Sequence, residues 1–190
     1  MAHGLRFLVR PVLIGLLTGF LPAAHAQAPA SNLNLFRNYF VTGDYSAGGV
    51  GLRGKGANGV AKGKIDIAGI PAGSRIIAAW LYWETAGVGA DGKFHGKAIK
   101  GTALGTVKSP CFVLPNLPDV IVYRADVLQF LDTNFPGDYI GGGRHEVELP
   151  DSGNANTAPS TMGATLVIVW AHTSRAVSYT HLTLPTILRV

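Results

Sequence analysis

The chain has 190 residues, of which 47% are hydrophobic and 14% are charged, and its formal net charge is +5. This length suits one domain with a substantial core and is short for two. The lysines and arginines are spread along the chain, whereas a nucleic-acid interface needs basic side chains gathered on one face, so the sequence argues against nucleic acid as a partner.

The first 26 residues predict export. Arg6 and Arg10 precede an apolar run from Pro11 to Leu21, and the small-residue tripeptide Ala24-His25-Ala26 follows. This order is what a secretory signal peptidase recognises. We therefore expect cleavage after Ala26, a flexible leader over residues 27–34, and a protein that is secreted, periplasmic or at the cell surface. The apolar run is shorter than the roughly 20 residues that span a bilayer, so a retained membrane anchor is the weaker interpretation. No transmembrane segment is predicted in the mature chain.

From residue 35 onward the sequence predicts short β-strands separated by turns. Leu35 to Thr42 alternates between two faces, and Gly43-Asp44 then predicts a turn. The glycine-rich stretch Tyr45 to Lys64 argues against a helix, because each interior glycine costs about 1 kcal/mol relative to alanine. Lys64 to Ile67 alternates again. Ile70 to Gly73 predicts a turn with its proline at the second position.

The run from Arg75 to Glu84 is apolar on both faces, as in a central strand that is covered on both sides. A helix is the competing interpretation, and the flanking turn residues and the aromatic content favour the strand. The expected faces are Ile77, Ala79, Leu81 and Trp83 on one side and Ile76, Ala78, Trp80 and Tyr82 on the other. The loop that follows contains Asp91-Gly92, which is a strong hairpin signal.

Four further segments complete the predicted set. They are a weakly alternating stretch (Lys93 to Lys108), a strand with a helical turn after it (Val120 to Ala125, then Asp126 to Leu131), and two more strands (His145 to Leu149 and Gly163 to Thr173). On the last strand Leu166, Ile168 and Trp170 share one face. Short strands without a long amphipathic helix predict an all-β protein, an antiparallel β-sandwich or jelly roll, over residues 35–176.

Several segments carry a resemblance to a known family. Gly43-Asp44-Tyr45, the turn Gly69 to Gly73, Trp80 to Trp83, Tyr123 to Val127 and Ala164 to Trp170 look like exported bacterial β-sandwich proteins described only as a domain of unknown function. The resemblance covers about residues 35–175. Because its motifs are strand and turn patterns, it implies the fold and the compartment and transfers no catalytic residue. In similar proteins the sandwich continues further, which implies that this one is truncated at its C-terminus.

The end of the chain resembles something different. Ser178 to Thr186 is similar to a translated sequencing-adaptor fragment that recurs at the ends of unrelated gene sequences from draft assemblies. We therefore interpret residues 177–190 as a non-native tail. The alternative is a short native strand from Thr180 to Val190.

Two motifs resemble known binding loops. Gly49 to Gly54 spells G-x-G-x-x-G, but extended glycine-rich sequence follows where a dinucleotide site needs a helix, so no nucleotide cofactor is expected. Asp132, Asn134 and Asp138 are spaced like the first ligands of a calcium loop. Pro136 in the fifth position and Gly143 in the twelfth exclude an EF-hand. A looser calcium site remains one interpretation, beside that of a simple turn.

Other catalytic or metal-binding patterns are weak. The histidines His95, His145 and His172 lie on separate segments without zinc-ligand spacing. A glycan hydrolase needs two carboxyl groups that face each other across a cleft, and no pair is favoured among Glu84, Asp126, Glu146 and Glu148. The single cysteine, Cys111, is buried, paired between molecules or missing its partner.

Trp80 and Tyr82 are the remaining candidates for ligand binding. They are predicted on one face of one strand, where flat apolar rings would stack on sugars if exposed. Burial is the competing interpretation, because a small sandwich needs aromatic side chains to fill its core. The sequence thus predicts a non-enzymatic, surface-associated binding or structural module with a polysaccharide or an envelope protein as partner. The alternative is a secreted glycan-processing hydrolase that uses a carboxylate pair.

Overall fold

The computed structural model describes residues 35–108, 118–134, 138–175 and 177–183. The strands are β1 (Leu35–Gly51), β2 (Gly56–Ala57), β3 (Val60–Ile67), β4 (Arg75–Ala86), β5 (Asp91–Phe94), β6 (Lys97–Lys100), β7 (Thr102–Val107), β8 (Val120–Asp126), β9 (Gly143–Pro150), β10 (Ser160–Ala171) and β11 (Val177–Thr183). A 3-10 turn, η1 (Leu128–Phe130), follows β8 where the sequence predicts a helical turn. None of the described elements is a helix long and apolar enough to cross a membrane.

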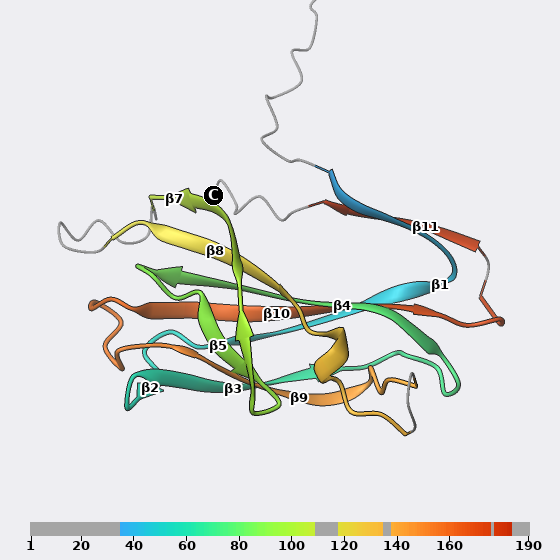
Figure 1. Ribbon diagram of the computed structural model, residues 1–190, viewed down its shortest axis with the longest axis horizontal. Coiled ribbons are helices and arrows are strands. Elements are labelled where there is room, and N and C mark those ends of the chain that lie inside the picture. Colours follow the sequence, from blue (N-terminus) through green and yellow to red (C-terminus); the bar gives the residue numbers. More distant parts are fainter. Residues whose placement is uncertain (1–34, 109–117, 135–137, 176, 184–190) are drawn as a thin grey trace, which may run out of the picture.

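These strands form two stacked antiparallel sheets, which confirms the predicted β-sandwich (Figure 1). One sheet has six strands in the order β11-β1-β10-β4-β8-β7, and the other has five in the order β2-β3-β9-β5-β6. The chain crosses from the second sheet to the first between β6 and β7, through Gly101. A Cβ at Gly101 would lie 2.5 Å from the Trp83 ring, so only glycine fits this crossing.

The main core lies between the two sheets, and alternation places it there as predicted. In the six-stranded sheet, β4 contributes Ala79, Leu81 and Trp83, and β10 contributes Leu166, Ile168 and Trp170. The facing sheet contributes Ile65, Phe94 and Val147. All nine side chains are buried, which accounts for the long apolar runs in β4 and β10.

A β-bulge changes the predicted faces at the start of β4. Val169 on β10 pairs with Ala78, and the next residue, Trp170, pairs with Ile76, so Ile77 has no partner in the register. The extra residue reverses the alternation. Ile76 therefore lies in the main core and Ile77 packs on the opposite face, the reverse of the sequence prediction, whereas Ala78 to Trp83 follow it.

Two predicted turns are displaced. The Ser74 amide donates to the Pro71 carbonyl and Gly73 has φ +80°, so proline occupies the first position of the turn and not the second. Asp91-Gly92 begins β5, and the hairpin turn lies at His95-Gly96, where φ is +48° and +72°. Two successive positive φ values make the primed type of turn that joins twisted strands. Sequence favours asparagine or aspartate at the first of these positions, so His95 was missed.

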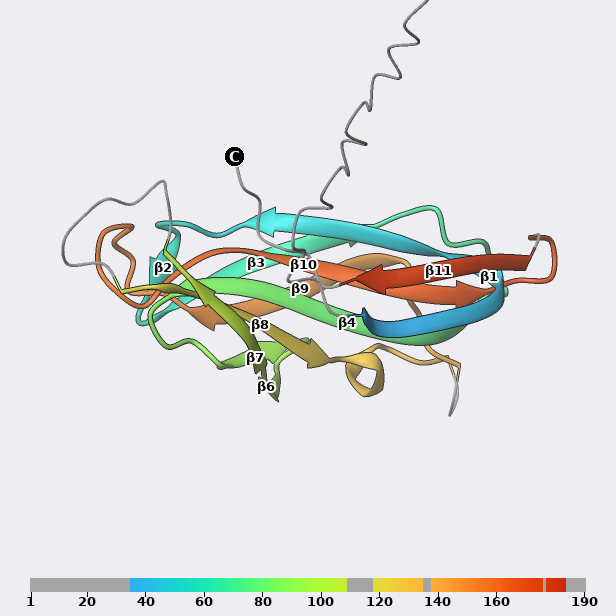
Figure 2. The same cartoon turned by 90° about the horizontal axis from the view of Figure 1, so that it is seen from above.

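The first strand has two halves with different partners. Gly43–Gly51 pairs with β10, whereas residues 35–42, which we call the arm, pair with β11. Strand pairing continues through Gly43-Asp44, where a turn is predicted, but the direction of the chain reverses there. Figures 1 and 2 show the arm and β11 lying over the outer face of the six-stranded sheet. A Cβ at Gly43 would collide with the carbonyl oxygen of Trp170, so the fold-back requires glycine.

Candidate functional site

Trp80 and Tyr82 lie next to each other on the outer face of the six-stranded sheet, outside the main core. They share that face as predicted, because they are two residues apart on β4. Each is 7% exposed. Together with Tyr39, Ala78 and Val169 they form a second hydrophobic cluster. We call this surface the aromatic face.

The arm covers the aromatic face. The Trp80 Nε1–H donates a 2.9 Å hydrogen bond to the Tyr39 hydroxyl. The Phe36 ring meets the Trp80 ring edge-on at 4.8 Å between centroids, a favourable arrangement for two aromatic rings. The Arg37 guanidinium carbon lies 5.5 Å from the Trp80 ring centroid. In this structure, a sugar therefore has no open ring to stack on at Trp80 or Tyr82.

Arg124 completes the contact between the arm and the sheet. It lies directly opposite Tyr82 on β8, and its guanidinium carbon is 3.3 Å from the centroid of the Phe36 ring. Its Nη1 is buried and has no hydrogen-bond partner among the described residues. Burial raises the pKa of Tyr82, and the nearby Arg124 charge partly opposes that rise. The phenol is therefore neutral at physiological pH.

Glu84 continues the row of Trp80 and Tyr82 along β4 toward the end of the sheet. It is half-buried, and burial raises the pKa of its carboxyl group. Its register neighbours are Val122 on β8 and Gly163 on β10, so the strands beside it bring no basic side chain directly opposite. The fold therefore holds Glu84 in an environment that disfavours its charged form.

The other candidate carboxylates of the hydrolase hypothesis are divided between two surfaces. Asp126 lies on the same face as Glu84, but it is opposite Trp80, which places it roughly 13 Å farther along the strands. Glu146 and Glu148 lie on the outer face of the five-stranded sheet. Glycosidase pairs are separated by about 5–9.5 Å across a cleft. Glu84 and Asp126 do not have this spacing.

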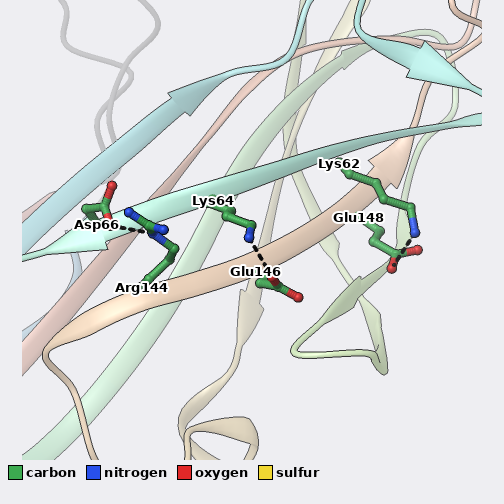
Figure 3. Close-up of polar contacts among 6 residues, drawn as sticks. All are labelled: Lys62, Lys64, Asp66, Arg144, Glu146 and Glu148. Carbon is green, nitrogen blue, oxygen red and sulfur yellow. Dashed lines mark hydrogen bonds and ion pairs between the residues drawn. The ribbon is translucent and has the colours of Figure 1, made fainter.

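Glu146 and Glu148 belong to a ladder of ion pairs between β3 and β9, which Figure 3 shows. Lys64 Nζ lies 3.2 Å from Glu146 Oε1, Lys62 Nζ lies 3.2 Å from Glu148 Oε1, and Arg144 Nε lies 3.0 Å from Asp66 Oδ1. Lys93 on β5 approaches Glu148 Oε2 at 3.8 Å. We call this surface the charged face. Each of these acidic side chains forms an ion pair with a lysine or an arginine.

The residues of the calcium prediction follow η1, and hydrogen bonds join the two described segments that contain them. Asn134 Nδ2 donates to Asp138 Oδ2 at 3.2 Å, while the Asp132 carbonyl accepts from the Ile140 amide at 2.7 Å. The structure thus brings Asn134 and Asp138 together through contacts that a simple turn also makes. No group of three or more His, Cys, Asp or Glu side chains within the described ranges is arranged to hold a metal ion. Calcium binding here stays a prediction.

Two histidines that are 50 residues apart in sequence meet at the edge of the main core. His95 Nε2 lies 3.0 Å from His145 Nδ1, and His145 Nε2 lies 3.0 Å from the Gly141 carbonyl oxygen. His145 is buried, and its ring stacks on Phe94 at 5.8 Å. Burial lowers the pKa of His145. Sequence reasoning missed this pair because it depends on the unexpected turn at His95-Gly96.

Cys111 and the predicted signal peptide and leader lie outside the described residues. Gly49 to Gly51 of the G-x-G-x-x-G motif lie within β1, with no helix after them. No protein-family model matches the chain, and no curated protein or solved structure is significantly similar to it.

Proposed function

We propose that this chain is an exported, non-enzymatic β-sandwich that acts as a surface-associated binding module through its aromatic face. The observation that carries the proposal is the composition of the contact between the arm and the sheet. Tryptophan, tyrosine, phenylalanine and arginine are the residues that dominate binding energy at protein interfaces. Here Trp80, Tyr82 and Arg124 lie together on the outside of a sheet. These residues are not part of the main core, which lies between the two sheets.

The arm indicates which kind of partner suits this face. It is an extended segment whose Phe36 and Tyr39 side chains insert over Trp80. An extended peptide from an envelope protein would make the same kinds of contact if it took the place of the arm. A polysaccharide would instead need the rings uncovered, since sugars stack on exposed aromatic faces. The covered geometry favours a protein partner over a carbohydrate.

Site-specific photo-crosslinking tests this proposal on the full chain. A photoreactive residue at Thr165 would report on the aromatic face, because Thr165 is exposed and lies opposite Tyr82. The same residue at Lys64 would report on the charged face and serves as the control. We expect a defined envelope-protein adduct from position 165 and none from position 64.

A second variant separates the partner classes. Replacing Phe36 and Tyr39 by alanine removes the side chains that cover Trp80, and it changes no residue of β4, β8 or β10. A glycan array probed with the wild type and with this variant shows whether uncovering the rings creates polysaccharide binding. Glycan binding without any adduct at position 165 would assign a carbohydrate partner. Equal adducts from both faces would contradict an aromatic binding face.

A further inference from the structure

The tip of the β5–β6 hairpin is attached to the rest of the sandwich by few contacts. Only two residue pairs join β5 to β9, Lys93 with Glu148 and Phe94 with Val147. One further backbone hydrogen bond, from the His95 amide to the Glu146 carbonyl, follows at 2.9 Å. Beyond these, the tip is held by the buried Phe94 side chain, by the partly exposed ion pair of Lys93 with Glu148 at 3.8 Å, and by the contact between His95 and His145.

The base of the same hairpin is anchored separately. The Gly101 amide donates to the Ala90 carbonyl at 2.7 Å, and Trp83 Nε1–H donates to the Gly89 carbonyl at 2.8 Å. The Gly89 amide donates to the Tyr123 hydroxyl at 3.1 Å. Because these contacts do not involve the histidines, the tip can separate from β9 while the base stays in place.

The hydrogen bonds of His145 define its protonation state. A carbonyl oxygen only accepts, so His145 Nε2 must carry the hydrogen that faces Gly141. A neutral ring then has a lone pair on Nδ1, which accepts the Nε2–H of His95. A second proton on His145 would have to occupy Nδ1, and His95 could then keep this bond only as acceptor, with its own hydrogen moved from Nε2 to Nδ1.

We propose that the His95–His145 pair is a proton-operated latch that holds the β5–β6 hairpin tip on β9 and releases it when His145 becomes charged. A proton from solvent on His145 Nδ1 ends the role of His95 as donor in this bond and creates a buried cation, which regains water if the tip lifts. Other charged groups act on His145: Asp132 after η1 and Asp66 on β3 favour the cation, while His95 disfavours it. Burial has a larger effect on the pKa of His145 than these charges have. The pH at which the tip is released therefore lies below the ordinary imidazole pKa of 6.5.

Amide hydrogen exchange measured by NMR on the full chain tests the latch. The reporter is the His95 amide, and the reference is the set of amides in the centre of β10. As the pH falls from the ordinary imidazole pKa of 6.5 toward the lowered pKa of buried His145, we expect protection of the reporter to fall about tenfold per pH unit and then to level off, the dependence of an opening linked to one proton. The reference amides should keep their protection over the same range.

Three variants make this test specific. In His145→Phe the ring stack on Phe94 is retained and the titrating group is lost, so exchange of the reporter should become independent of pH. His95→Asn tolerates the positive φ but is too short to reach His145, so His145 should take up its proton at higher pH than in the wild type. His172→Asn is the matched control, since His172 bonds to Ser174 elsewhere and should leave the response unchanged. A full pH response in His145→Phe, an unchanged midpoint in His95→Asn, or simultaneous loss of protection in β10 would overturn the proposal.

Discussion

The two outer faces of this sandwich differ in how their side chains are accommodated. The charged face pairs lysines and an arginine with acids across β3 and β9, and its side chains remain largely in water. The aromatic face presents Trp80 and Tyr82, which would be exposed on a bare sheet, and the arm covers them. Exposed ion pairs contribute about 0.2–1 kcal/mol each, whereas burying a large apolar side chain contributes about 1.5–3 kcal/mol. Stability should therefore depend much more on the aromatic face than on the charged face.

The largest effect is expected for Trp80→Ala. The substitution removes a buried ring, its hydrogen bond to Tyr39 and its edge contact with Phe36. We expect a loss of about 3–5 kcal/mol in the free energy of unfolding, measured by urea denaturation. Lys64→Ala on the charged face is the control and should change stability by less than about 0.5 kcal/mol. Similar losses for the two variants would mean that the arm adds no stability.

Gly43→Ala tests whether the fold-back positions the arm. The new Cβ would collide with backbone of Trp170, which cannot move aside as a flexible side chain can. We expect a loss of about 1–3 kcal/mol, the usual range for overpacking, together with increased solvent exposure of Trp80 seen by fluorescence.

Gly51→Ala is the matched control for this prediction. Gly51 lies on the same strand, and a Cβ there would meet no atom within 4 Å. Its substitution should leave both stability and Trp80 fluorescence nearly unchanged. If Gly43→Ala behaved in the same way, the reversal of the chain at this point would not require glycine.

The contrast between the two faces also shows what sequence patterns can predict. Alternation along β4 and β10 places the core residues correctly, because a side chain's face follows directly from its position in a strand. The same rule places Trp80 and Tyr82 together. It fails at Ile76 and Ile77, where a bulge adds one residue, and no local pattern in the run Arg75 to Ala79 marks that bulge.

Contacts between segments far apart in the sequence could not be predicted from these patterns. The aromatic side chains of β4 outside the core are covered by a segment more than 40 residues earlier in the chain, and the contact between His95 and His145 joins two strands through an atypical turn. Gly43 does indicate that the chain changes direction. The position of the arm after this reversal depends on the shape of the whole sheet, which cannot be predicted from short-range periodicity.

The stability of Glu84→Gln should depend on pH differently from that of the wild type, because Glu84 is a half-buried acid on the outer face that carries Trp80 and Tyr82. Burial raises the pKa of Glu84 in the folded state above its ordinary value of 4.5. The folded protein therefore binds this proton more tightly than the unfolded chain, and wild-type stability falls as pH rises through the window above 4.5. We expect Glu84→Gln to be more stable than the wild type at pH 7 and to lose this advantage below pH 4.5. Urea denaturation at pH 4 and pH 7 measures the difference, and an advantage of equal size at both values would exclude the titration of Glu84 as its cause.

The smallest effect is expected on the charged face. Lys64 and Glu146 are 58% and 61% exposed, so a double-mutant cycle with alanine should give a coupling energy of about 0.2–1 kcal/mol that decreases in high salt. Lys62 and Glu148 should couple more strongly, because Glu148 is only 25% exposed and is also approached by Lys93. Directly opposed charges of opposite sign also favour one register of β3 against β9, since a slip of one residue would place every lysine in the core. A coupling of several kcal/mol that resisted salt would mean that the charged face is covered in solution, and the contrast with the aromatic face would then disappear.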